Sequence, residues 1–311
     1  MPCNVLFSGS DEDWAAYATP LREALAEARV DAALGRDFAD AEVDYIVIAG
    51  GSPITDYRPF TRARAILRLW AGVEDIVGNE TISIPIARMV GGGLDQGMIE
   101  WVTAHVLRHH IGMDAHIHGQ DGVWRNTIVP RHAGERTVTI LGLGALGGAC
   151  GRALAGLGFD VTGWSRTPKD IPGIRCLSGA EGFAAALDGA EIVVLLLPKT
   201  PETENTLDAA ALARLAPGAF LLNPGRGALI DDGALLAALD QGQVAHATLD
   251  VFRTEPLPAD HPYWSHPQVT VTPHIASSTH PVLASGVIAE NVRRGEADLP
   301  FLHLVDRAAG Y

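Results

Sequence analysis

The chain has 311 residues, of which 47% are hydrophobic and 19% charged, so it is long enough for two domains and has the composition of a soluble globular protein. Its net charge of −14, from 23 basic and 37 acidic side chains, argues against nucleic acid and anionic membranes as partners, because both would be repelled. The three cysteines, Cys3, Cys150 and Cys176, are far apart and form no C-x-x-C pair, so the sequence suggests neither a disulfide framework nor a zinc site. A location in the reducing cytoplasm fits this best.

The first 94 residues alternate strand patterns with helix patterns. We predict strands at residues 4–8, 43–49 and 82–86, and helices at residues 11–29 and 61–70. This alternation is typical of a parallel sheet covered by helices on both faces, so the predicted fold class is α/β. The N-terminus lacks the basic and apolar segments of a signal peptide, and the densest apolar run, residues 192–197, is too short to span a membrane.

A long helical pattern covers residues 95–110, and a loop rich in His, Gly, Asn and Pro follows at residues 112–134, which we call the arm. His105 and His109 lie one helical turn apart, a spacing that suits two metal ligands. However, no cysteine or carboxylate cluster completes a tetrahedral set. We therefore predict no metal site and interpret the region as a domain boundary followed by an arm.

An apolar strand pattern at residues 137–141 then leads into the turn G-L-G-A-L-G, which opens a helical pattern. In this context G-x-G-x-x-G indicates a dinucleotide site. Gly142 permits the tight turn, Gly144 lets a pyrophosphate approach, and Gly147 lets the helix lie close to the strand. The free N–H groups at the helix start, those of Ala145 and Leu146, would meet the phosphates. The alternative is a plain strand-to-helix turn in an alanine- and glycine-rich chain.

The next predicted strand, residues 159–163, ends without the Asp or Glu that would bind the ribose of NAD. A segment with cations and hydroxyl groups follows instead, made of Trp164, Ser165, Arg166, Thr167 and Lys169. Such a segment would attract a 2′-phosphate, so we predict a preference for NADP. The alternative is a solvated polar loop, with Asp170 or another acid serving NAD.

Strands predicted near residues 219, 244 and 269 release polar side chains at their carboxyl ends, where ligands of open α/β sheets bind. Arg226 follows the first strand, Asp250 and Glu255 follow the second, and His274 follows the third. We predict that Arg226 holds a keto-acid carboxylate and polarises the carbonyl, that His274 protonates the forming alkoxide, and that Glu255 keeps the imidazole oriented and charged. Taken singly, each could be a surface cation, a solvated loop charge or a structural histidine.

Five motifs stand in the order found in one known family. They are the G-L-G-A-L-G turn, L-L-L-P-K-T-P-E-T at residues 195–203, N-P-G-R-G, L-D-V-F-x-x-E-P and T-P-H. Over essentially the whole chain, the sequence resembles the D-isomer-specific 2-hydroxyacid dehydrogenases. Residues 164–167, the P-L-P…W-x-H-P run at 256–267 and the C-terminal V-D-R-A-A-G-Y are most similar to the NADP-dependent glyoxylate/hydroxypyruvate reductase A branch.

The resemblance implies two Rossmann-like doubly wound parallel-sheet domains: a flavodoxin-like substrate domain at residues 1–94 plus 276–311, and a dinucleotide-binding domain at residues 95–275. It implies NADPH-dependent reduction of glyoxylate and hydroxypyruvate, and a homodimer packed through the helix and the arm. The implied catalytic residues are Arg226, Glu255 and His274. Further implied contacts are the backbone N–H groups of Ala71, Gly72 and Val73 to the substrate carboxylate, Asp250 to the nicotinamide amide, and Leu197, Pro198 and Thr203 to the cofactor.

The sequence departs from that branch at two places. Residues 48–52 lack an expected aromatic side chain, and residues 91–93 are glycines where acidic residues are expected, which leaves the size of the substrate open. Two other functions also stay open. One is an NAD-linked dehydrogenase for a larger acid of the phosphoglycerate or D-lactate type, and the other is a regulatory module that senses nicotinamide cofactors without catalysis.

Overall fold

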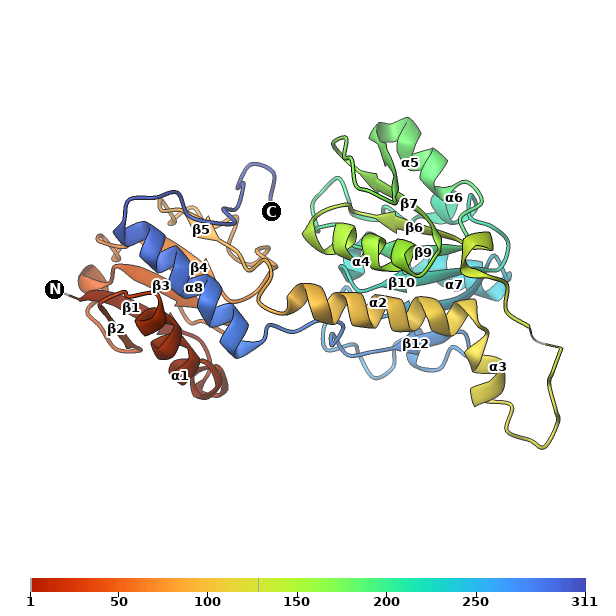
Figure 1. The fold of residues 1–311 in the computed structure, drawn as a ribbon, viewed down its shortest axis with the longest axis horizontal. Helices are drawn as coiled ribbons and strands as arrows, with labels where there is room; N and C mark the ends of the chain where they lie inside the picture. Colours follow the sequence, from red (N-terminus) through yellow and green to blue (C-terminus); the bar gives the residue numbers. More distant parts are fainter. Residues whose placement is uncertain (1, 128) are drawn as a thin grey trace. The chain divides into compact units, whose positions relative to one another are not determined.

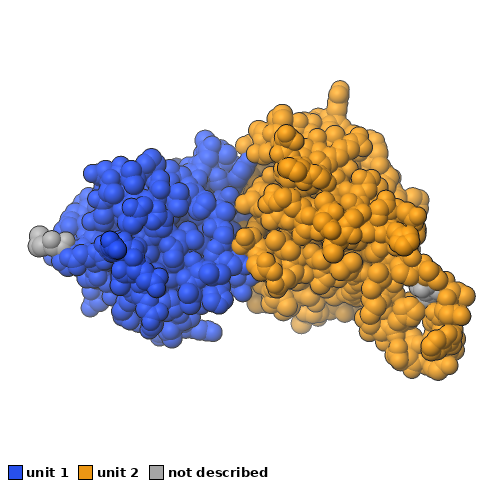
Figure 2. All heavy atoms as spheres, viewed as in Figure 1, with its two compact units in different colours: residues 1–94, 278–311 blue, residues 95–277 orange. Residues whose placement is uncertain are grey.

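The computed structural model describes residues 2–127 and 129–311 and divides into two compact units. Unit 1 comprises Met1–Leu94 and Ser278–Tyr311, and unit 2 comprises Asp95–Ser277; Figure 2 shows them in blue and orange. Each unit contains its own parallel sheet with helices, which confirms the predicted α/β class with two doubly wound sheets. In the described parts of both units, no helix combines the length and the apolar character that crossing a membrane requires.

Unit 1 is built on a five-stranded sheet in the order β2-β1-β3-β4-β5. All neighbouring strands are parallel, and this order is that of flavodoxin-like folds. The strands are short, and all except the edge strand β2 are largely buried, so their side chains form the core of the unit. Their bounds are β1 Cys3–Ser8, β2 Ala32–Gly35, β3 Tyr45–Ile48, β4 Ala65–Arg68 and β5 Ile86–Ala87.

Two helices from opposite ends of the sequence pack side by side in unit 1 (Figure 1). They are α1, Asp11–Glu27, and α8, Pro281–Glu296. The Ser10 side chain caps α1 by accepting a hydrogen bond from the Asp13 N–H, and three acidic residues in the first turn complement the helix dipole. Helical spacing places the apolar side chains of each helix on one buried face: Tyr17, Leu21 and Leu25 of α1, and Ala284, Ile288 and Val292 of α8.

The predicted helix at residues 61–70 is wrong, because this segment contains the interior strand β4. Its residues are continuously buried and pair with β3 on one side and β5 on the other. A short apolar run cannot be assigned to helix or strand by periodicity, and the alanine, leucine and arginine of this run favour helix by intrinsic propensity. Tertiary pairing overrode that preference. The edge strand β2, which has only partly buried residues, was not predicted.

Unit 2 contains a seven-stranded sheet in the order β12-β11-β10-β9-β6-β7-β8, again with parallel neighbours. The order reverses between β6 and β9, which is the position where such sheets bind ligands. The strand bounds are β6 Thr137–Leu141, β7 Asp160–Ser165, β8 Arg175–Ser178, β9 Ile192–Leu195, β10 Ala219–Asn223, β11 Val244–Leu249 and β12 Val269–Val271.

Helices cover this sheet and complete the unit. The long helix α2, Leu94–His110, buries Met98, Val102 and Val106 against side chains of β6 and β9. The other helices of unit 2 are α3 Met113–Ile117, α4 Ala145–Gly156, α5 Gly179–Leu187, α6 Ala209–Leu212 and α7 Asp232–Asp240, with 3-10 turns at Ala133–Glu135, Gly227–Leu229 and Pro262–Trp264. Unit 1 has a 3-10 turn at Asp40–Glu42. The arm contains α3 and then runs away from the sheet of unit 2 as an irregular loop (Figure 1).

Candidate active site

The glycine turn after β6 has a geometry that only glycine permits at two of its three positions. Gly142 has φ +111°, and a Cβ there would lie 2.5 Å from the Leu196 carbonyl oxygen. A Cβ on Gly147 would lie 1.8 Å from the Gly142 oxygen, so the helix could not approach the strand. At Gly144, by contrast, no described heavy atom lies within 4 Å of the Cβ position. That exposed space fits a pyrophosphate against the backbone.

The start of α4 provides positive potential at this open space. The helix N-cap is Gly144, which offers no side chain to the first N–H groups, and the first turn, Ala145 to Gly147, carries no charged residue. Gly144 and Ala145 are exposed and Leu146 is partly exposed. The orphan N–H groups and the positive helix end are therefore available to an anion, so the residues present fit the phosphates of a dinucleotide.

The carboxyl end of β7 lies beside the glycine turn, because the Gly142 N–H donates to the Trp164 carbonyl over 2.8 Å, and Arg166, Thr167 and Lys169 follow directly. The Trp164 indole is directed elsewhere: its N–H donates to the Gly179 carbonyl, and its ring packs on Phe183. The Ser165 hydroxyl donates to the Thr167 carbonyl and so shapes the turn. In this structure, Trp164 and Ser165 thus support the segment from within.

The cationic part of this segment is exposed, at Arg166 and Lys169. One acidic neighbour was not predicted. The pKa of the Glu202 carboxyl group is lowered, mainly by a hydrogen bond from the Thr200 side chain and more weakly by the nearby charge of Arg166. Glu202 belongs to the loop after β9, and its distance in the sequence from Arg166 gave no signal that the two charges interact.

The loop after β9 contains the other predicted cofactor residues and closes on itself. The Thr203 hydroxyl donates to the Pro198 carbonyl over 2.7 Å and accepts from the Thr200 N–H over 2.8 Å. Leu197 is buried, and its backbone nitrogen lies 2.9 Å from the Cβ position of Gly142. The loop therefore forms a fixed wall next to the glycine turn.

Arg226 is presented by a tight loop after β10. The buried Asn223 side chain holds this loop, since its Nδ2 donates to the Arg226 carbonyl over 2.9 Å and its Oδ1 accepts from the Gly225 N–H over 3.1 Å. A Cβ on Gly227 would lie 2.0 Å from the Phe252 carbonyl carbon, so the loops after β10 and β11 contact each other backbone to backbone. Sequence analysis missed Asn223, although an Asn directly before a Pro-Gly turn is a known turn-forming signal.

Glu255 and His274 form a direct pair. The His274 Nδ1 lies 2.7 Å from the Glu255 Oε2, and the Glu255 Oε1 accepts from the Phe252 N–H over 2.8 Å. Because Nδ1 faces a carboxylate, it is the nitrogen that carries the proton, which leaves Nε2 for other chemistry. The His274 side chain is 53% exposed and its Nε2 bonds to none of the residues that the structure describes. The structure therefore brings together a carboxylate and an accessible imidazole, as a general acid requires.

Asp250 is fully buried, and its carboxylate is already engaged. It accepts hydrogen bonds from the Thr272 hydroxyl over 2.6 Å and from the N–H groups of Ile275 and Ala276, both over 2.9 Å. The Asp250 carbonyl also accepts from the N–H of His274, whose φ of +55° is in the left-handed region. In this structure Asp250 fixes the loop that carries His274.

The predicted carboxylate-binding turn lies in unit 1, directly after β4. It does not follow a helix, as the sequence suggested, because residues 65–68 form a strand. Val73 is buried, and its carbonyl accepts from the N–H groups of Ile76 and Val77. Ala71 and Gly72 are partly exposed at the carboxyl end of the parallel sheet.

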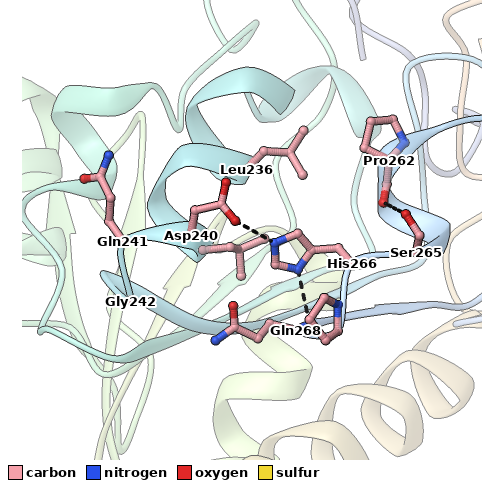
Figure 3. Close-up of a pocket in the computed structure, with 10 residues that line it drawn as sticks. Leu236, Asp240, Gln241, Gly242, Pro262, Ser265, His266 and Gln268 are labelled. Carbon is pink, nitrogen blue, oxygen red and sulfur yellow. Dashed lines mark hydrogen bonds and ion pairs between the residues drawn. The ribbon is translucent and has the colours of Figure 1, made fainter.

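Two pockets in unit 2 differ in how close they lie to the predicted catalytic residues. The pocket in Figure 3, of about 650 Å³, is lined by Asp240, His266 and Gln268 among others. Its residues precede β11 and β12, so it lies at the amino ends of the strands, opposite the edge that carries Arg226 and His274. A smaller cavity of about 210 Å³ lies behind the catalytic loops and includes Asn223, Gly227 and Phe252. We place the chemistry at the carboxyl edge because the reactive groups gather there.

His109 of α2 packs into the core of unit 2. His109 is buried, its ring is stacked on Phe220, and its Nε2 lies 2.9 Å from the Thr248 hydroxyl. Burial lowers the pKa of His109 to about 3. Within residues 2–127 and 129–311, no three His, Cys, Asp or Glu side chains are placed to hold a metal ion.

Comparisons with known proteins agree with this geometry. The family model described as "D-isomer specific 2-hydroxyacid dehydrogenase, NAD binding domain" matches residues 101–276. Glyoxylate/hydroxypyruvate reductase A of Serratia proteamaculans is 42% identical over 258 residues, which cover 80% of this chain and 82% of that protein. The protein of the same name from Yersinia enterocolitica is 39% identical over 256 residues, with the same coverage of both chains.

Solved structures match the chain over its full length. A D-isomer specific 2-hydroxyacid dehydrogenase from Xanthobacter autotrophicus, in complex with NADPH and MES, is 37% identical with a TM-score of 0.92 and full coverage of both chains. The NADPH-dependent glyoxylate/hydroxypyruvate reductase of Sinorhizobium meliloti, in complex with NADP and sulfate, is 32% identical with a TM-score of 0.85 and covers 100% of this chain and 99% of that one. The chain belongs to the D-isomer-specific 2-hydroxyacid dehydrogenases.

Proposed function

We propose that the protein is an NADPH-dependent reductase of small 2-keto acids, with glyoxylate and hydroxypyruvate as substrates. The observation that carries this proposal is the pair of Glu255 and His274, with 2.7 Å between carboxylate and imidazole, on the same sheet edge as Arg226 and the glycine turn. Relatives named glyoxylate/hydroxypyruvate reductase A support the substrate class. Similar structures in complex with NADPH or NADP support the cofactor.

The cofactor would be held by unit 2, the proposed dinucleotide-binding domain. Gly142, Gly144 and Gly147 shape the turn, and the N–H groups of Ala145 and Leu146 would bind the phosphates. Arg166 and Lys169 would pair with the 2′-phosphate, and Thr167 would add a hydroxyl group. We retain Trp164, Ser165, Leu197, Pro198 and Thr203 as residues that shape the binding surface, and Asp250 as the support of the adjoining loop.

Three side chains would carry the reaction. Arg226 binds the keto-acid carboxylate and polarises the carbonyl through its guanidinium group, which can form two parallel hydrogen bonds. With protons on both ring nitrogens and Glu255 as its counter-ion, His274 would donate the Nε2 proton to the carbonyl oxygen as negative charge develops there, and it would keep the Nδ1 proton that Glu255 accepts. When bound, the nicotinamide supplies the hydride. Ala71, Gly72 and Val73 of unit 1, the proposed substrate domain, would offer backbone N–H groups to the carboxylate.

The test is the oxidation of NADPH and of NADH, followed by absorbance, with glyoxylate, hydroxypyruvate, pyruvate and bulkier 2-keto acids. We expect fast oxidation of NADPH with the two smallest substrates and slower oxidation of NADH. Faster turnover of NADH with bulky acids would instead identify an NAD-linked dehydrogenase for a larger substrate. Tight binding of NADPH without turnover of any acid would identify a cofactor-sensing module.

We also propose that the protein is a homodimer assembled through the arm. The arm carries large apolar side chains in solvent: Trp124 is 88% exposed, Val129 is 77% exposed and Val123 is 62% exposed. Large apolar side chains exposed in one segment are typical of a protein interface, and a second copy of this chain is the occupant that the resemblance implies. Light scattering should give twice the mass of the chain for the native protein and a monomer for the Trp124→Ser, Val129→Ser double variant.

The cysteine chemistry supports a cytoplasmic location as a further part of this proposal. Cys3, Cys150 and Cys176 are free thiols, and burial raises the pKa of Cys3 to about 11 and that of Cys150 to about 12. The raised pKa values make these two thiols poor nucleophiles, and it is the lack of a disulfide among the three cysteines that fits a reducing compartment. Fractionation of the native host should recover the protein with cytoplasmic markers.

A further inference from the structure

The C-terminal segment, Val305–Tyr311, forms a closed loop on unit 1, and the function proposed above assigns no role to it. It begins beside β5, where the Val305 N–H donates to the Ile86 carbonyl over 2.8 Å (dark blue in Figure 1). The Asp306 N–H donates to the Tyr311 carbonyl, and the Gly310 N–H donates to the Asp306 carbonyl. The Asp306 carboxylate also accepts from the N–H groups of Ala308 and Ala309. The segment is therefore held in one conformation around Arg307.

Arg307 uses its whole guanidinium group on one other loop. Its Nε donates to the Val77 carbonyl over 3.1 Å, its Nη1 to the Ile82 carbonyl over 2.6 Å, and its Nη2 to the Asn79 carbonyl over 2.7 Å. Three carbonyl oxygens from a stretch of six residues thus converge on one cation. A planar group with donors in fixed directions can bind all three, which a lysine ammonium on its flexible stem cannot reproduce.

The loop that Arg307 holds is continuous with the turn at Ala71, Gly72 and Val73. The Val73 carbonyl accepts from the N–H groups of Ile76 and Val77 over 3.0 and 2.8 Å, so Val77 belongs to the same hydrogen-bonded turn. Val73 and Ile76 anchor one side of the turn in the core of unit 1, and Val305 packs against that same cluster. Arg307 holds the following residues of the loop through the carbonyl groups of Val77, Asn79 and Ile82.

We propose that Arg307 is a positioning residue for the 2-keto acid, acting through this loop on the turn at residues 71–73. The inference rests on the proposed function, since it takes that turn as the site that binds the substrate carboxylate. Backbone N–H groups bind an anion well only when they are already oriented toward it. Arg307 supplies this orientation from the end of the chain, so the C-terminal segment contributes to substrate affinity without contacting the substrate.

The decisive experiment compares Arg307→Ala, Arg307→Lys and the native protein by backbone hydrogen exchange and by steady-state kinetics. In Arg307→Ala we expect faster exchange confined to residues 73–82. We also expect the KM for glyoxylate to rise about tenfold while the KM for NADPH stays within about twofold, because only the positioning of the acid is impaired. Arg307→Lys should fall between the two, since it keeps the charge but loses the three-point geometry.

The matched control is Arg293→Ala, which removes another arginine of unit 1, one that pairs with Glu290 on the surface of α8. It should leave exchange at residues 73–82 and both KM values unchanged. Because the Arg307 side chain is exposed, its replacement leaves the apolar core intact. If the alanine variant does not fold, hydrogen exchange and the KM values of Arg307→Lys test the proposal instead. Unchanged exchange at residues 73–82 would overturn the positioning role, and it would do so even if the native protein reduced no keto acid. Loss of kcat with both KM values unchanged would show a purely structural role.

Discussion

At His274, backbone and side chain are constrained by different partners. Asp250 holds the backbone of the loop through its carboxylate and its carbonyl, whereas Glu255 holds the ring. The three residues follow β11 and β12, so neighbouring parallel strands bring them to one edge. Sequence patterns could predict that these side chains meet, because the carboxyl ends of parallel strands share an edge. They could not predict that Asp250 would be buried and already hydrogen-bonded, because its partners follow the next strand, β12, and leave no pattern around Asp250 itself.

Replacing His274 tests the proton transfer directly. His274→Gln keeps a polar side chain of similar size but removes the proton donor, so we expect kcat for glyoxylate to fall by about 10²- to 10⁴-fold. The affinity for NADPH, measured by fluorescence titration, should stay unchanged because the glycine turn is untouched. Glu255→Gln, which can still hydrogen-bond to the ring, should have a smaller effect on kcat. A rate near that of the native protein for His274→Gln would rule out the proposed role.

Replacing Arg166 tests the preference for NADP. A charge-assisted hydrogen bond to phosphate contributes about 1.5 to 3 kcal/mol, so Arg166→Ala should raise the KM for NADPH by roughly 10- to 100-fold. The KM for NADH should change little, because NADH has no 2′-phosphate. The measurement is the ratio of kcat/KM for the two cofactors, with Arg175→Ala on β8 as the surface control. An equal loss with both cofactors would place Arg166 outside the 2′-phosphate site.

At the scale of elements, the sequence predicted most of the units that carry the site and failed where tertiary contacts decide. The strand, glycine turn and helix at β6 and α4 are locally encoded, since each glycine has a backbone reason that the motif makes visible. The segment at β4 is not, because its buried run of Ala, Ile, Leu and Arg suits a helix as well as a strand. This error affected the prediction for the site, because the turn at residues 71–73 follows a strand and not a helix. The turn therefore lies at the carboxyl edge of the sheet of unit 1. Arg307 contacts residues that precede it by 225 to 230 positions in the chain. A contact over this separation leaves no local pattern in the sequence, so it could not be predicted.

At the scale of the whole molecule, the buried histidines predict how stability depends on pH. Burial, and then the charge of neighbouring groups, lowers the pKa of His109 to about 3 and that of His246 to about 4. In the unfolded chain both would titrate near 6.5. Below about pH 6.5 the unfolded state therefore binds protons that the folded state does not, so the free energy of unfolding falls as the pH is lowered toward 4. His109 alone should account for about 2 kcal/mol between pH 6.5 and pH 5.

Urea unfolding of the full chain at pH 7, 6 and 5 measures this dependence, and His109→Phe isolates its main source. Phenylalanine can keep the stacking on Phe220 but cannot take up a proton, so the variant should lose less stability than the native protein on going from pH 7 to pH 5. It should be less stable at pH 7, because the Thr248 hydroxyl loses its buried partner. His132→Gln, at an exposed histidine of the arm, is the control and should leave the slope with pH unchanged. If the slopes of the native protein and His109→Phe were equal, His109 would not remain neutral in the folded protein, and the acid sensitivity would have to come from other groups.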